Sequence, residues 1–96
     1  MIVRIMADNQ YRIDKAHRAD VAEIERLDEE MAAAVNANQD VRFHQALTHL
    51  IEHVHHAGQA LPVEELMPSD LMVPAADMTV AEARAVLQTV REDAHV

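Results

Sequence analysis

The feature that most constrains the fold is a pair of long amphipathic segments separated by only three residues, 38–40. No Gly or Pro interrupts the first segment from Lys15 to Ala37, and the second runs on to Gly58, the only glycine. In both segments apolar residues recur at helical spacing. They are Val21, Ile24, Leu27, Met31, Ala34 and Val35 in the first segment and Phe43, Ala46, Leu47, Leu50, Ile51 and Val54 in the second. A connection this short predicts an antiparallel helical hairpin.

The ends of these helices carry capping residues. Asp14 is a candidate N-cap of the first helix, and Asp20 followed by Glu23 is an alternative that resembles a capping box. Asp40 is expected to cap the second helix, and Gly58 to end it. The start of the first helix is therefore placed only within about four residues.

Residues 2–6 and 10–13 have the alternating pattern of two short strands, joined by a turn at residues 7–9. Alternation assigns one face to the core and leaves the other as a mixed outer face. The core face carries Val3, Ile5, Tyr11 and Ile13, and the outer face carries Ile2, Arg4, Met6 and Arg12. The chain is thus predicted to open with a β-hairpin.

All three prolines lie within residues 59–78, where no long helical period is found. Within this stretch Leu71-Met72-Val73 is expected to form a short edge strand. Residues 79–82 match a capping box, and Val80, Ala83, Val86, Leu87 and Val90 follow as the apolar face of a third helix. The predicted fold class is α+β, with an N-terminal β-hairpin, a two-helix hairpin, a Pro-containing loop with an edge strand, and a C-terminal helix. A single domain is expected over residues 1–91, with a frayed tail over 92–96.

Composition excludes several classes of protein. The absence of cysteine rules out disulfides and thiolate metal sites. No signal-peptide layout and no long apolar run occur, so a cytoplasmic protein without membrane insertion is expected. A formal charge of −9 opposes binding to nucleic acid. The charge is uneven, because residues 1–18 sum to +2 and residues 19–96 to −11.

Seven histidines are unusual for 96 residues, and five of them fall on the second predicted helix. His49, His53 and His56 line one flank of its apolar stripe and are weak candidates for a metal site. A zinc site normally needs more ligands, and no HExxH arrangement occurs, so we expect no metal and no cofactor. A histidine-based pH- or metal-responsive regulator remains the alternative function, since histidines change charge between about pH 5 and 8.

Residue types that could support catalysis lack a suitable context. Ser69 is not in a nucleophile elbow, and a single glycine cannot form a phosphate-binding loop. Asp28-Glu29-Glu30 and Glu64-Glu65 are typical of solvated surfaces rather than of acid–base pairs. We therefore expect a protein that is not an enzyme.

The outer face of the hairpin is the predicted partner-binding site. Its residues Ile2, Arg4, Met6 and Arg12 combine apolar anchors with arginine, which is the composition of protein interfaces. A two-stranded hairpin also has open edges, which would allow a homodimer or a partner to add a strand. The alternative is that a segment of the same chain, such as Leu71–Val73, covers this surface.

Read together, several of these segments resemble the PspA-associated protein family. They are the hairpin of residues 2–6 and 10–14, Leu61-Pro62, the Pro-Ser-Asp-Leu-x-x-Pro run of residues 68–74, and the Asp-x-Thr-x-x-Glu run of residues 77–82. The resemblance covers about residues 1–90. It implies a non-enzymatic accessory in the envelope-stress response whose partner is a coiled-coil protein like phage shock protein A. It also implies a cytoplasmic location. The protein would lie at the inner face of the membrane when its partner is bound to the membrane. The histidine-rich helix and residues 15–20 depart from the family pattern.

Overall fold

The computed structural model describes residues 1–65 and 67–94, with side chains described through residue 87. It confirms the α+β class and the predicted order of elements, with one additional strand. The elements are β1 (Ile2–Ile5), β2 (Gln10–Arg12), α1 (Arg18–Asn36), α2 (Asp40–Ala57), β3 (Gln59–Ala60), β4 (Leu71–Val73) and α3 (Val80–Ala94).

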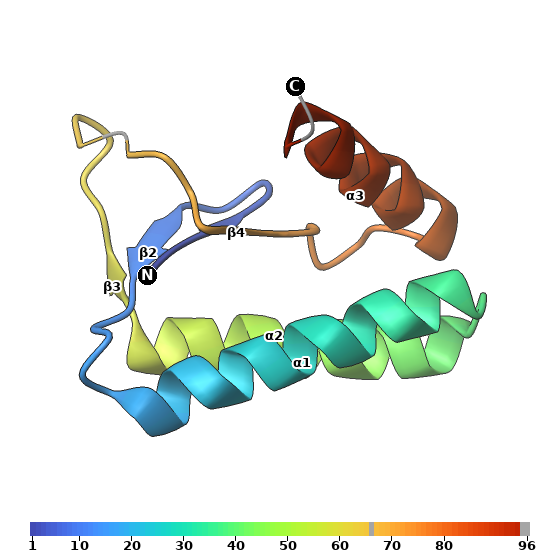
Figure 1. Ribbon diagram of the computed structural model, residues 1–96, viewed down its shortest axis with the longest axis horizontal. Helices are drawn as coiled ribbons and strands as arrows, with labels where there is room; N and C mark the ends of the chain where they lie inside the picture. Colours follow the sequence, from blue (N-terminus) through green and yellow to red (C-terminus); the bar gives the residue numbers. More distant parts are fainter. Residues whose placement is uncertain (66, 95–96) are drawn as a thin grey trace.

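The two long helices form the predicted hairpin and make up one layer of the molecule (Figure 1). The sheet covers one half of this layer and α3 lies over the other half. The apolar stripes of both helices face the core and are buried within the domain. Its buried residues are Ile24, Leu27, Met31, Ala34 and Val35, and those of α2 are Phe43, Ala46, Leu47, Leu50 and Val54.

The sheet has the strand order β3-β2-β1-β4. The hairpin strands β1 and β2 are antiparallel, β3 pairs antiparallel with β2, and β4 pairs parallel with β1. Leu71–Val73 is therefore the predicted edge strand. The expectation of an open hairpin edge is wrong, because β4 and β3 occupy both outer edges of the hairpin. Strand addition by a second copy would have to use β3 or β4 instead.

The sequence prediction missed β3, which follows directly from the end of α2. The chain turns there at Gly58, whose φ of −99° lies in the extended region. A Cβ on Gly58 would lie 2.7 Å from Ile13 Cδ1 and 2.8 Å from the carbonyl oxygen of Val54. Glycine is required at this position for close approach of the chain to the hairpin.

Two of the three predicted helix starts need correction. Before α1, Asp14 accepts a hydrogen bond from the Ala16 N–H at 2.9 Å and forms a local turn, so it does not cap the helix. The residue before α1 is His17, which makes no side-chain capping bond, and Asp20 lies inside the helix. Similarly, Asp40 is the first residue of α2 rather than its cap. Its carboxylate still lies at the positive end of the helix dipole.

The third helix begins with the predicted capping box. The Thr79 N–H donates to Glu82 Oε1 at 3.0 Å, and the Glu82 N–H donates to Thr79 Oγ1 at 3.1 Å. Arg84 on this helix donates to the Val35 carbonyl at 2.6 Å and to Asn38, which joins α3 to the turn between α1 and α2. The helix continues to Ala94, beyond the predicted domain boundary at residue 91. Residues 95 and 96 of the predicted tail, and the side chain of Val90, lie outside the described parts.

Candidate functional site

The outer face of the sheet is the surface directed away from the two long helices. Strand register places Ile2 opposite Arg12 and Arg4 opposite both Gln10 and Met72. Directly paired residues project from the same side of a sheet. The predicted binding residues of β1 and β2 therefore share one face, whereas Val3 and Ile5 are buried against the helices.

Part of this face is contacted by residues of the segments 61–65 and 67–70, which we call the crossing loop. The Ile2 N–H donates to Asp70 Oδ2 at 2.7 Å, and the Asp70 N–H donates to the Ile2 carbonyl at 2.8 Å. Ile2 is 7% exposed, so it is not the accessible anchor that the sequence predicted. Because Val3 pairs with Leu71, the two bonds between Ile2 and Asp70 extend the pairing of β1 with β4 and place Asp70 beside Ile2.

Gln10 holds the crossing loop against the outer face. It is 4% exposed, and its Nε2 donates to the Met67 carbonyl at 2.6 Å and to Ser69 Oγ at 2.9 Å. The backbone carbonyl of Gln10 also accepts a hydrogen bond from the Leu61 N–H at 2.9 Å. Both ends of the loop are thus attached to one residue of β2. Nothing in the sequence indicated this role, because a glutamine in a short strand is equally compatible with an exposed position.

Arg4 and Arg12 remain exposed on the outer face, and Met6 and Met72 beside them are half-buried. Within the described residues no carboxylate lies within 4.0 Å of either guanidinium group. Among the described residues the Arg12 side chain makes one hydrogen bond, of 3.3 Å to Met67 Sδ, a weak acceptor. The two cations are therefore available to an anionic partner.

Arg26 and Arg42 on the helical layer differ in this respect. Arg26 lies 2.6 Å from Glu23 and 3.2 Å from Glu30, and Arg42 lies 3.8 Å from Glu30. The hydrogen bond from Arg26 lowers the pKa of Glu23 below its ordinary value. Glu23 and Glu30 are thus part of a solvated charge network on the helical layer.

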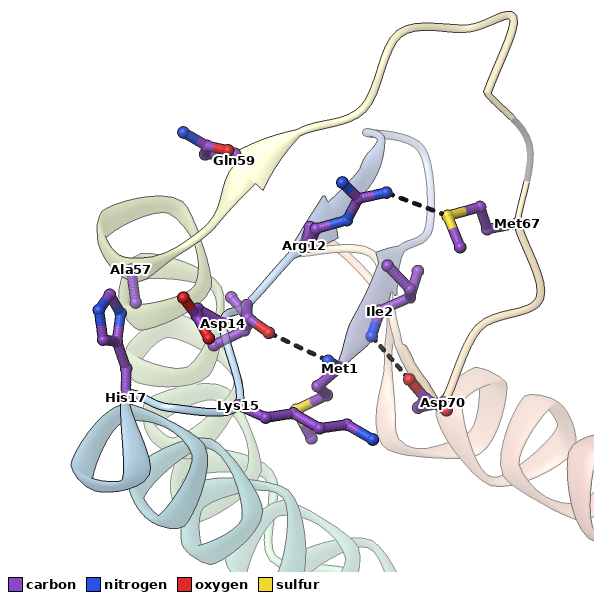
Figure 2. A pocket seen from close by; sticks show the side chains of 11 residues that line it. Met1, Ile2, Arg12, Asp14, Lys15, His17, Ala57, Gln59, Met67 and Asp70 are labelled. Atoms are coloured by element: carbon purple, nitrogen blue, oxygen red, sulfur yellow. Dashed lines mark hydrogen bonds between the residues drawn. The ribbon is translucent and has the colours of Figure 1, made fainter.

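A groove of about 760 Å³ continues from the outer face toward the start of α1 (Figure 2). The linker between β2 and α1 forms one wall, and the crossing loop with the first residues of β1 forms the other. Its apolar lining is Met1, Ile2, Ile13, Ala57 and Met67, and its polar lining is Arg12, Asp14, Lys15, His17, Gln59 and Asp70. Only Ile2 and Arg12 of this set were predicted as binding residues. Lys15 and Met67 were missed because the loop that completes the groove is remote in sequence.

Two histidines of α2 pair with carboxylates of other elements. His53 Nε2 lies 3.0 Å from Asp20 Oδ1 on α1, and His55 Nε2 lies 2.6 Å from Asp8 Oδ2 in the hairpin turn. The Tyr11 hydroxyl is 3.1 Å from both oxygens of Asp8. Burial, and then the hydrogen bond and charge of Asp8, raise the pKa of Tyr11. These contacts join the end of α2 to the rest of the fold.

The three metal candidates are not assembled into a metal centre. His49, His53 and His56 line a shallow depression with Glu23, Leu27 and Glu52. His53 is directed to Asp20, and no group of three or more potential ligands is arranged to hold a metal ion in the described part of the chain.

No helix within the described residues is long and apolar enough to cross a membrane. Comparison with curated proteins and with solved structures finds no match to the chain. The sequence does match a protein family, described as PspA-Associated protein, over residues 1–94. This range includes the hairpin, both long helices, the crossing loop and α3, so the chain belongs to the PspA-associated protein family.

Proposed function

We propose that this protein is a non-enzymatic interaction module that binds phage shock protein A, or a similar coiled-coil protein, through the outer face of its sheet. The contact residues in this proposal are Arg4, Met6 and Arg12. The observation that carries it is the exposure of two arginines with no carboxylate within 4.0 Å among the described residues. The family match associates the chain with PspA but identifies no binding surface.

Charge and composition support this choice of surface. The chain carries a formal charge of −9, so an exposed cationic face is exceptional on it. Arginine forms paired hydrogen bonds with carboxylates and is enriched in interfaces, as is methionine. Met6 and Met72 supply flexible apolar surface beside Arg4. The partner surface is expected to combine carboxylates with apolar side chains.

Ser69 and the histidines of α2 make contacts that favour a structural role for these side chains. Ser69 Oγ accepts a hydrogen bond from Gln10 and helps to hold the crossing loop. His53 and His55 each bridge α2 to another element. These contacts support a binding module over an enzyme.

In this proposal the protein acts in the cytoplasm as part of the envelope-stress response. It would reach the inner face of the membrane only through its partner. A homodimer is not required for the outer face to function, because that face lies within one chain.

The test is a binding titration of the purified protein with the PspA homologue of the same organism. Arg4→Glu combined with Arg12→Glu is expected to weaken binding at least about 100-fold, because like charges across an interface cost several kcal/mol. The matched control is Arg26→Glu with Arg42→Glu, which changes the net charge equally on the helical layer. That control should stay within about threefold of the wild type. Equal weakening by both pairs, with folding preserved, would assign the interaction to another surface or to net charge alone.

A further inference from the structure

We infer that the groove between the β2–α1 linker and the crossing loop binds a carboxylate-bearing, apolar segment of the partner protein. This inference rests on the proposed function, because the groove is continuous with the outer face through Ile2 and Arg12. It adds a second contact region and specifies the chemistry of the segment that enters it. Lys15 and Met67 are assigned as binding residues in addition to Arg12.

The cations of the groove lack strong acceptors. Among the described residues the Arg12 guanidinium makes one hydrogen bond, to Met67 Sδ, and Lys15 extends from the linker toward the Asp70 side of the groove (Figure 2). Within the described residues Lys15 has no carboxylate within 4.0 Å. Both side chains are exposed and can move to meet a ligand.

The two carboxylates that line the groove already accept backbone hydrogen bonds. Asp14 Oδ1 accepts the Ala16 N–H at 2.9 Å, and Asp70 Oδ2 accepts the Ile2 N–H at 2.7 Å. One oxygen of each carboxylate is thus engaged by the fold, whereas neither cation has a carboxylate within 4.0 Å among the described residues. This difference favours an anionic ligand over a cationic one.

The apolar lining distinguishes a protein segment from a simple anion. Met67 is 40% exposed and its Sδ lies 3.3 Å from the Arg12 guanidinium, so an apolar side chain packed on Met67 would lie beside a carboxylate bound to Arg12 (Figure 2). The volume of about 760 Å³ is in the range of sites that enclose a ligand of several side chains. A flat anionic membrane is a poorer fit, because the groove is concave and the chain carries −9 overall.

The experiment follows backbone amide resonances of the labelled protein during titration with two synthetic peptides. One contains Glu and Leu, and the other has Lys at every Glu position. The Glu peptide is expected to shift the amides of Arg12, Lys15 and Met67 at concentrations where the Lys peptide has no effect. Lys15→Glu should weaken this binding at least about tenfold. Arg18→Glu, a charge change three residues away that does not line the groove, should alter it less than about threefold.

The outcomes separate the inference from the proposed function. If Lys15→Glu and Met67→Ser bind full-length PspA as the wild type does, while reversal of Arg4 and Arg12 abolishes binding, the groove inference is wrong and the function stands. If PspA does not bind at all but the Glu peptide occupies the groove, the proposed function is wrong and the inferred ligand chemistry of the groove is supported. Shifts produced by phosphatidylglycerol vesicles and not by the Glu peptide would replace the protein ligand with a lipid surface.

Discussion

The side-chain amide of Gln10 exchanges two hydrogen bonds with the backbone of Met67. Its Nε2 donates to the Met67 carbonyl at 2.6 Å, and its Oε1 accepts the Met67 N–H at 3.3 Å. The amide thus pairs with the crossing loop much as a neighbouring strand would. This contact is made across 57 positions of sequence and fixes one wall of the proposed binding groove.

Gln10→Ala is expected to destabilise the protein by about 2–3 kcal/mol, because buried hydrogen bonds to Met67 and Ser69 are lost. Denaturant unfolding measures the loss, and hydrogen exchange at the Met67 amide reports local release of the loop. Gln59→Ala, at an exposed position of the same sheet, is the control and should change stability by less than about 0.5 kcal/mol. If the Met67 amide of the Gln10→Ala variant exchanged hydrogen at the wild-type rate, Gln10 would not be the anchor of the crossing loop.

Gly58→Ala is expected to cost about 1–3 kcal/mol through overpacking. The added Cβ would lie 2.7 Å from Ile13 Cδ1 and 2.8 Å from the Val54 carbonyl oxygen. Ile13→Val removes the first of these contacts, so the double variant should recover part of the loss measured for Gly58→Ala. A strictly additive double variant would show that the contact with Ile13 is not the source of strain.

Thr79→Ala is expected to cost about 1 kcal/mol through loss of the N-cap bond to Glu82. The backbone N–H of Thr79, and then its side chain, lower the pKa of Glu82. A folded-state pKa below the unfolded one contributes stability above the unfolded value, and this is lost as the pH falls through the folded value. The stability difference between the wild type and Glu82→Gln should therefore shrink below about pH 5. Glu64→Gln, at an exposed position outside the capping box, is the control.

Asp28→Asn is expected to stabilise the protein at neutral pH. Burial, and then the charge of Glu29, raise the pKa of Asp28 above its ordinary value. The ionised carboxylate is thus penalised in the fold, and the penalty disappears as the pH falls toward the ordinary value of 3.8. Solvent screening limits the gain to about 0.5 kcal/mol. Thermal melts at pH 7 and near pH 3.5 test this, with exposed Asp77→Asn as the control; an equal gain at both pH values would contradict the role of charge.

The parts of the fold predicted from sequence are those determined by local interactions. The helical hairpin follows from two apolar stripes and a three-residue connection, and the Thr79–Glu82 box from residues three positions apart. The edge strand Leu71–Val73 is bounded by prolines on either side. The helix starts were harder to predict. An aspartate such as Asp14 can either cap a helix or form a local turn, and here its carboxylate accepts the Ala16 N–H in a turn.

The candidate site was only partly predictable. Alternation in the hairpin placed Arg4 and Arg12 on the outer face. It could not show that Ile2 is buried and joined to Asp70, because the two hydrogen bonds between residues 2 and 70 link segments that are remote in sequence. Gly58 was the best available signal of close packing, yet it was interpreted only as the end of a helix.

The parallel pairing of β1 with β4 has a consequence for synthesis of the chain. Residues 3–5 acquire their second strand neighbour only when residues 71–73 have left the ribosome. Until then β1 exposes backbone groups that can pair with other chains. Contacts of this sequence separation also form slowly. A polypeptide that stops before Leu71 would contain both long helices and the hairpin, and yet would display an unpaired strand, so truncated products are expected to aggregate while the full-length chain does not.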